Sequence, residues 1–265
     1  MAWKRLLRSF AMRSLKHALV LALLLLATST VTAADFSGLE LFIPVVSRVP
    51  GANATQWRTD LVIANRGEFE ATTVKLVYEP ANASPVQSSV TIPALGSVTI
   101  PDVLLETFGR EQSYGTLWLG TLHEESPIVA HARIYNVGNA NGEFGQLIQA
   151  MPINQLTKNV WLNGVIGIRG NRTNLGIANP NNGVAKYTLS WYDKSGNLQG
   201  TLANQTVQPW EVTLLNDIFL QLHSAPDEGT TIRITADVPI YAYASVVRND
   251  STGDAYTIMG DGTDE

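Results

Sequence analysis

Residues 58–65 read RTDLVIAN, and residues 172–179 repeat this stretch as RTNLGIAN. In both copies Thr, Leu and Ile occupy every second position, which is the period-two pattern of a β-strand with one buried face. A stretch that recurs along a chain marks two copies of one folding unit. The sequence therefore predicts a duplicated, strand-rich fold.

The similarity continues beyond the repeated strand. In order along the chain come a turn rich in Asn and Gly, an alternating strand, a strand with an Asx residue and an apolar cluster, and a closing hairpin. The matching pairs are residues 65–67 and 179–183, 74–78 and 187–191, 97–105 and 211–219, and 127–132 and 239–244. An Asx residue before an apolar cluster predicts a capped helical turn.

Each copy holds about seven or eight short strands, with turn signals every 8 to 12 residues or so and little helical periodicity. We therefore expect an all-β fold of two tandem immunoglobulin-like (Greek-key) β-sandwich domains. The predicted boundaries are 34–153 for the first module and 154–265 for the second, which we expect to abut around residues 154–158. A merged barrel or a pair of propeller-like sheets is the alternative, although a propeller blade repeats every 40 to 50 residues or so.

The order Arg-Thr-Asx-Leu-x-Ile-Ala-Asn, then a turn, then an alternating strand ending in Tyr-Glu or Tyr-Asp, resembles the immunoglobulin-like modules of bacterial exported and cell-surface proteins. The resemblance covers nearly all of the chain after the N-terminal segment. It implies a fold and a location outside the cytoplasm. Such modules variously act as spacers, bind or assemble, so the resemblance does not imply one function.

Residues 1–33 have the order of a secretory signal peptide. Five Lys and Arg residues precede an apolar run at 18–27, and small residues follow at 29–34, which predicts cleavage after Ala33. An uncleaved membrane anchor is the rival interpretation, but the apolar run is shorter than the 20 residues or so that span a bilayer. We expect a secreted or periplasmic protein whose mature chain has no membrane span.

The charge of the chain restricts its partners, and its cysteine content restricts its chemistry. The chain has 18 Lys and Arg against 23 Asp and Glu, and loss of the five cations of the signal leaves a formal net charge of −10. An acidic surface repels phosphate backbones, so nucleic acid is not an expected partner. Because the chain has no cysteine, it contains neither disulfides nor thiol nucleophiles, and packing must stabilise it.

No metal, cofactor or catalytic residue is predicted. The histidines after the signal, His123, His131 and His223, lack the spacing of a zinc or copper site. Asp250 and Asp254 offer oxygen ligands for calcium, but the matching loop of the first copy offers only Glu143, so a turn is the favoured interpretation. No Gly-x-Ser-x-Gly motif occurs, whereas a glycosidase pair of carboxylates from distant strands stays open.

Six residues are candidate contacts for a ligand or partner: Trp57, Arg58, Arg172, His131, Arg133 and Tyr135. Trp57 precedes the repeated strand and could stack on a sugar or anchor a protein, and Trp118, Trp161, Trp191 and Trp210 compete for that role. His131, Arg133 and Tyr135 share one strand face, for which we favour a solvated face over a ligand contact unique to the first module. Arg58 and Arg172 could each bind a partner carboxylate, but we favour ion pairs with Glu79 and Asp193.

Two functions follow from these features. The first is a non-enzymatic protein that acts in adhesion, surface assembly or protein binding at the cell envelope, with edge strands available for strand addition. The second is a carbohydrate-binding or carbohydrate-processing protein with an aromatic platform that includes Trp57.

Overall fold

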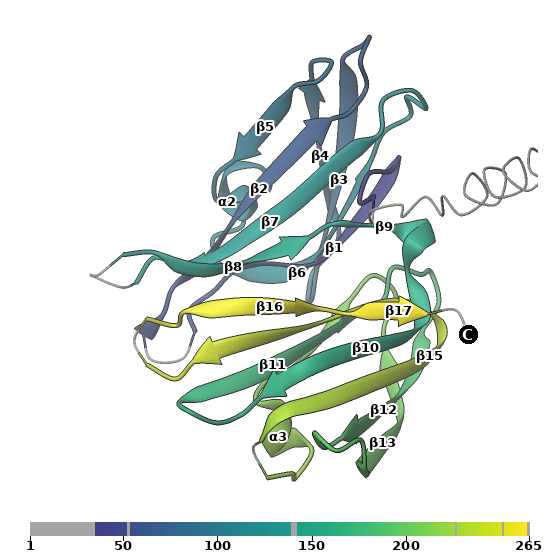
Figure 1. Ribbon diagram of the computed structural model, residues 1–265. Coiled ribbons are helices and arrows are strands. Elements are labelled where there is room, and N and C mark those ends of the chain that lie inside the picture. Colours follow the sequence, from purple (N-terminus) through teal and green to yellow (C-terminus); the bar gives the residue numbers. More distant parts are fainter. Residues whose placement is uncertain (1–34, 52–53, 139–141, 226, 251, 264–265) are drawn as a thin grey trace, which may run out of the picture. The chain divides into compact units, whose positions relative to one another are not determined.

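The computed structural model describes residues 35–51, 54–138, 142–225, 227–250 and 252–263. Residues Phe36–Glu265 form one compact unit. The predicted signal peptide lies outside the described residues. Among the described residues, no helix is long and apolar enough to cross a membrane. The described fold is all-β and antiparallel, which confirms the predicted class (Figure 1).

The first repeat forms two sheets. One is five-stranded, in the order β4-β3-β6-β1-β9, and the other is four-stranded, in the order β5-β2-β7-β8. The bounds are β1 Glu40–Arg48, β2 Trp57–Asn65, β3 Thr72–Pro80, β4 Val86–Ile92, β5 Ser97–Ile100, β6 Ser113–Gly120, β7 Ile128–Asn136, β8 Phe144–Gln149 and β9 Met151–Pro152. A short helix, α2 (Val103–Glu106), follows β5.

The second repeat has the same neighbour order. Strands β13-β12-β15-β10-β17 correspond to the five-stranded sheet, and β14-β11-β15-β16 correspond to the four-stranded one. The bounds are β10 Thr157–Ile166, β11 Asn171–Ala178, β12 Ala185–Tyr192, β13 Leu198–Val207, β14 Val212–Leu215, α3 Ile218–Gln221, β15 Glu228–Arg248, β16 Ala255–Met259 and β17 Asp261–Thr263. A 3-10 turn, η2 (Ile153–Gln155), precedes β10. The two repeats differ in one respect. In the second repeat a single continuous strand, β15, belongs to both sheets and takes the places that β6 and β7 have in the first repeat.

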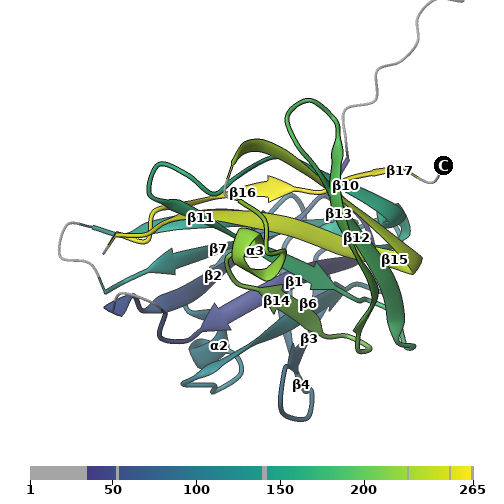
Figure 2. The ribbon, with the colours of Figure 1, turned by 90° about the horizontal axis from the view of Figure 1, so that it is seen from below.

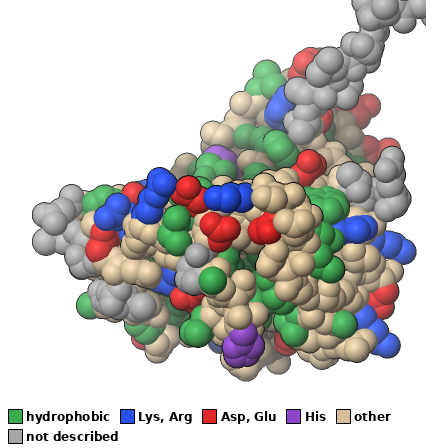
Figure 3. Space-filling view, turned by 60° about the horizontal axis from the view of Figure 1, so that its bottom comes forward, with side chains coloured by type: hydrophobic (Ala, Val, Ile, Leu, Met, Phe, Trp, Pro, Cys, Tyr) green, Lys and Arg blue, Asp and Glu red, His purple; other side chains and the backbone are tan. Residues whose placement is uncertain are grey.

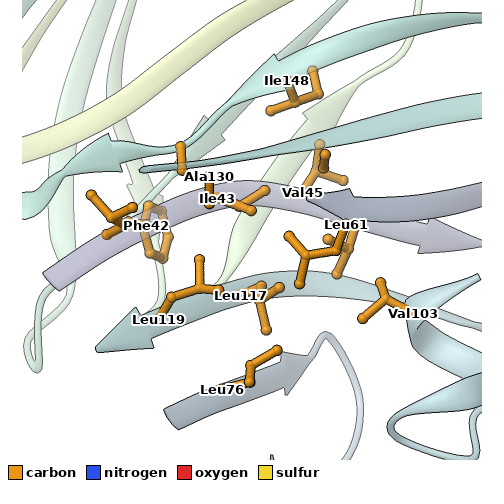
Figure 4. Close-up of a cluster of buried hydrophobic side chains, with 14 of the residues drawn as sticks. Phe42, Ile43, Val45, Leu61, Leu76, Val103, Leu117, Leu119, Ala130 and Ile148 are labelled. Carbon is orange, nitrogen blue, oxygen red and sulfur yellow. The ribbon is translucent and has the colours of Figure 1, made fainter. Parts of the chain in front are cut away.

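The inner faces of the two sheets of the first repeat meet in a hydrophobic core. Along β2, Thr59, Leu61 and Ile63 are buried and alternate with partly exposed residues, as the sequence predicts. Leu61 points toward Leu117 and Val103 in Figure 4, so strands of both sheets and the helical turn close on one cluster. The second repeat has its own core, whose buried members all lie between Val160 and Ala244.

The helical turns occur where they are expected but are not capped as predicted. Asp102 and Asp217 occupy the N-cap positions of α2 and α3 in the left-handed region, with φ of 38° and 49°. Neither side chain makes a cap hydrogen bond. The turn therefore depends on the backbone conformation and on packing of the apolar residues that follow.

The two repeats share a broad interface. Four residues of the second repeat, namely Ala178, Val212, Tyr241 and Tyr243, belong to the core cluster of the first. Strand β16 lies beside β8, and β11 lies beside β1 (Figures 1 and 2). The contact therefore extends far beyond the segment around residues 154–158 at which the sequence predicts that the modules abut.

Candidate functional site

A cleft of about 730 Å³ lies between the repeats, and it brings together two of the predicted contact residues, Trp57 and Arg172. We call it the Trp57 cleft. The first repeat lines it with Val45, Ser47, Val49, Pro50, Gly51, Trp57, Tyr114, Ile134 and Gln146, and the second with Arg172, Asn174, Leu214, Asn216, Tyr243, Ser245 and Val247. Its volume is in the range of small-ligand sites, and its mixture of apolar walls with a few polar groups is typical of them.

Trp57 is the first residue of β2. Its side chain is partly buried and packs against the first core. A Cβ atom on Gly51 would lie 2.3 Å from the indole Nε1, so the absence of a side chain at residue 51 leaves room for the ring. Trp57 is therefore a positioned wall of the cleft.

Arg172 is the cationic residue of the Trp57 cleft. Its Nη1 donates a hydrogen bond to Asn249 Oδ1 at 2.6 Å. Burial lowers the pKa of the guanidinium from its usual value, and the nearby Asp217 carboxylate opposes that shift, but an arginine stays protonated at physiological pH. Among the described residues no carboxylate lies within ion-pair distance of Arg172.

Arg58, the equivalent residue of the first repeat, has a carboxylate partner. Its Nε lies 3.4 Å from Asp102 Oδ2, and Arg48 Nε lies 2.9 Å from the same oxygen. The prediction of an ion pair with Glu79 is therefore wrong. The expected pair of Arg172 with Asp193 is also wrong, because the Asp193 carboxylate accepts hydrogen bonds within its own turn, from the backbone N–H groups of Ser195 and Asn197.

Arg133 and Tyr135 lie with His131 on the outer face of β7. The Tyr135 hydroxyl donates to Asp60 Oδ1 at 3.0 Å, while Arg133 contacts Asp60 at 3.6 Å and Glu143 at 3.0 Å. The Arg133 guanidinium also lies 4.3 Å from the centre of the Tyr135 ring. Burial, together with the hydrogen bond to Asp60, raises the pKa of Tyr135 to about 12. The structure thus joins Arg133 and Tyr135 with Asp60 and Glu143 in one charged cluster, none of whose members lines the Trp57 cleft.

The other residues of the repeated motif have structural roles. Thr59 and Thr173 are buried and hydrogen-bond the backbone of the preceding strand, at Ser47 and Ile166 respectively. Asn65 and Asn179 are buried at the end of the motif, and each donates to three backbone carbonyls. The fold therefore accounts for the repetition of the motif, and features that differ between the copies are better candidates for function.

The other tryptophans have different surroundings. Trp118 and Trp210 line a second cleft of about 510 Å³, which we call the Trp118 cleft. Trp161 lies 5.1 Å from the guanidinium of Arg233. Trp191 packs against the core of the second repeat. Neither cleft was predicted from the sequence. The run Ile240–Val247 is nevertheless mostly apolar at both odd and even positions, which is typical of a strand whose two faces are both covered.

Asp250 and Asp254, for which the sequence favours a turn over a calcium site, lie in the segment between β15 and β16. The Asp250 carboxylate accepts hydrogen bonds from Arg248 and from Thr252, and these bonds lower its pKa to about 2. Within the described residues no group of three His, Asp or Glu side chains could hold a metal ion. Residues 139–141 and Ser251 of the two hairpin tips lie outside the described residues.

On the face shown in Figure 3, cationic and anionic side chains are interspersed along a band.

No protein-family model and no curated protein matches this chain. The crystal structure of Thermotoga maritima 1070 is 17% identical, with a TM-score of 0.35, over 44% of this chain and 97% of that one. A Pleurotus ostreatus lectin in complex with GalNAc is 11% identical, with a TM-score of 0.15, over 88% of this chain and 86% of that one. Bacteroides uniformis β-glucuronidase 2 is 9% identical, with a TM-score of 0.16, over 77% of this chain and 25% of that one. At these scores the similarities carry no argument about ligand or function.

Proposed function

We propose that this chain is an exported, non-enzymatic binding protein built from two immunoglobulin-like β-sandwich modules, and that it holds a protein partner at the cell envelope through the Trp57 cleft. The observation that carries the proposal is that Trp57 of one repeat and Arg172 of the other line the same cleft. The N-terminal sequence supports export, since it has the order of a signal peptide.

The chemistry of the cleft defines the partner. Arg172 offers a guanidinium that has no described carboxylate within ion-pair distance, and a charge-assisted hydrogen bond to a carboxylate is among the stronger polar contacts. Trp57 and Tyr243 add aromatic walls, and buried aromatic and Arg residues dominate many binding interfaces. We infer that the partner inserts an acidic side chain next to an apolar or aromatic one.

An acidic carbohydrate is the second candidate. Asn174, Asn216 and Gln146 supply side-chain amides to the same cleft, and an aromatic wall beside amides and an arginine suits a sugar that carries a carboxylate. Both candidates use Trp57 and Arg172, so the ligand class has to be determined by binding.

The test is capture of envelope proteins by residues 34–265, run beside a glycan array on the same preparation. Trp57→Ala and Arg172→Gln should each abolish the specific signal, while Arg66→Gln removes a charge from an exposed residue outside the cleft and should keep it. Retention of one protein supports the first candidate, and selective binding of acidic glycans supports the second. Retention that survives both cleft variants, or turnover of a substrate by the purified protein, would overturn the proposal.

A further inference from the structure

The Trp118 cleft has the composition of a site for an organic cation. It lies between the outer face of the five-stranded sheet of the first repeat and two turns of the second, and it encloses about 510 Å³. Its lining includes Trp118 and Trp210 together with the acidic residues Glu40 and Glu79. It shares no lining residue with the Trp57 cleft.

Both aromatic walls are held in place. A Cβ atom on Gly120 would lie 2.1 Å from Cη2 of Trp118, so the indole lies directly over the glycine on β6. Trp210 Nε1 donates to Asn182 Oδ1 at 3.0 Å, and the Trp210 carbonyl accepts a hydrogen bond from Thr116. Rings that are fixed before binding lose little conformational entropy when a ligand enters.

Glu40 and Glu79 are the acidic residues of this cleft. Among the described residues, neither Glu40 nor Glu79 has a Lys, Arg or His nitrogen within ion-pair distance. Partial burial raises the pKa of Glu79 from its usual value. An alkylammonium group would supply the missing charge, and tryptophan is the best aromatic partner for such a cation.

We propose that the Trp118 cleft binds an alkylammonium group, with Trp118 and Trp210 against its apolar part and Glu40 and Glu79 against its charge. Free quaternary amines and amino sugars carry this chemistry. The site is independent of the partner proposed for the Trp57 cleft.

Isothermal titration calorimetry on residues 34–265 tests the site with two matched pairs of probes. Choline is compared with its neutral isostere 3,3-dimethylbutan-1-ol, and glucosamine with N-acetylglucosamine. Binding of a cation at least about tenfold tighter than its neutral counterpart supports the site, and the tighter of the two cations identifies the source. Equal binding of the neutral probes, or no heat from any of the four at millimolar concentration, would show the proposal to be wrong.

Variants separate the site from a general charge effect. Glu79→Gln and the more exposed Glu40→Gln should each weaken the cation about tenfold, and Gly120→Ala should do the same by displacing the Trp118 ring. Glu106→Gln removes the same charge from an exposed residue outside the cleft and should have no effect. Trp57→Ala should leave cation binding intact, so that failure here and failure of the proposed partner site are distinguishable.

Discussion

Asn179 donates a hydrogen bond from Nδ2 to the carbonyl oxygen of Val207 at 3.1 Å. The same nitrogen reaches the carbonyls of Gly183 and Gln208, and Oδ1 accepts from the backbone N–H of Asn181. Asn179 is fully buried, and its hydrogen bond to the Val207 carbonyl is buried as well, whereas the bonds to Gly183 and Gln208 are partly buried. The last residue of the repeated motif therefore joins three backbone segments of its module.

Asn179→Ala should lower the free energy of unfolding by about 2 kcal/mol, since it removes three hydrogen bonds and leaves the buried Val207 carbonyl without this donor. Asn65→Ala should have a similar effect in the first repeat. Chemical denaturation monitored by circular dichroism measures both. Asn154→Ala, at an exposed residue, is the control and should stay within about 0.5 kcal/mol of the parent. A loss at Asn179 no larger than that of the control would show that the hydrogen bonds are dispensable.

Asp102 and Asp217 should respond differently to the loss of their charge. Asp102 accepts ion pairs from Arg48 and Arg58, whereas among the described residues Asp217 has none within ion-pair distance. Asn tolerates the left-handed conformation of both positions. Asp102→Asn therefore leaves two arginines close together without a counterion, and it should destabilise the chain by about 1 to 3 kcal/mol.

Asp217→Asn is the matched control and should change the free energy of unfolding by less than about 0.5 kcal/mol. Both variants are compared by urea denaturation at low ionic strength, where charge repulsion is least screened. Equal effects of the two substitutions would contradict the role assigned to the Arg48, Arg58 and Asp102 cluster.

Much of the fold is predictable from the repeated stretch, and much of the site is not. Thr59, Leu61 and Ile63 lie at alternate positions of one strand. Because successive side chains of a strand point to opposite faces of the sheet, all three lie on the face that packs in the core. The ion-pair partner of Arg58 was predicted wrongly because a turn brings Asp102 to it from 44 positions along the chain. Local alternation contains no information about such a contact.

The clefts escaped prediction for a related reason. They exist because the outer face of β11, β14 and β15 packs on the first repeat, so two similar modules are placed in different environments. The register pairs Val62 with His131 in one copy and Gly176 with Tyr243 in the other. In the second copy, the aromatic ring of Tyr243 therefore lies opposite a glycine, which the first copy lacks. This difference between the copies is the sequence feature that could have indicated an interface.

Tyr135 should titrate at abnormally high pH. Its pKa is raised to about 12 by burial and by the Asp60 carboxylate, so the neutral phenol is favoured in the folded state. The resulting stabilisation is fully present below the unfolded pKa of about 10 and is lost as the pH rises through about 12. Asp60→Asn should lower the pKa while keeping an oxygen that accepts the hydrogen bond.

The Cζ chemical shift of Tyr135, assigned with Tyr135→Phe, follows this titration by NMR. Replacement of Lys186, a charged residue on the other repeat, by Gln should leave the curve unchanged. A Tyr135 pKa that Asp60→Asn does not lower would show that burial alone accounts for the shift.

Gly176 makes room for a ring at the repeat interface. A Cβ atom at this position would lie 2.1 Å from Cε1 of Tyr243, and Tyr243 belongs to the first core. Gly176→Ala should therefore destabilise the chain by about 1 to 3 kcal/mol through overpacking. At Gly183 nothing lies within 4 Å of an added Cβ, so Gly183→Ala is the control in a thermal-unfolding comparison. Equal melting temperatures for the two variants would show that the ring can move aside freely.

The two repeats should differ in their ability to fold alone. The core of the first includes Tyr241 and Tyr243, and the Tyr241 hydroxyl donates to the Gln149 carbonyl at 2.8 Å, whereas the buried core of the second is drawn entirely from its own residues. Residues 34–153 should therefore lack a cooperative unfolding transition when isolated, because removal of the second repeat exposes part of their core to water. Residues 154–265 should retain one and should bind a hydrophobic dye through the uncovered tyrosines. Mixing the two fragments should restore the unfolding transition of the first repeat and suppress dye binding. Cooperative unfolding of residues 34–153 by themselves would contradict this expectation and would support two autonomous modules.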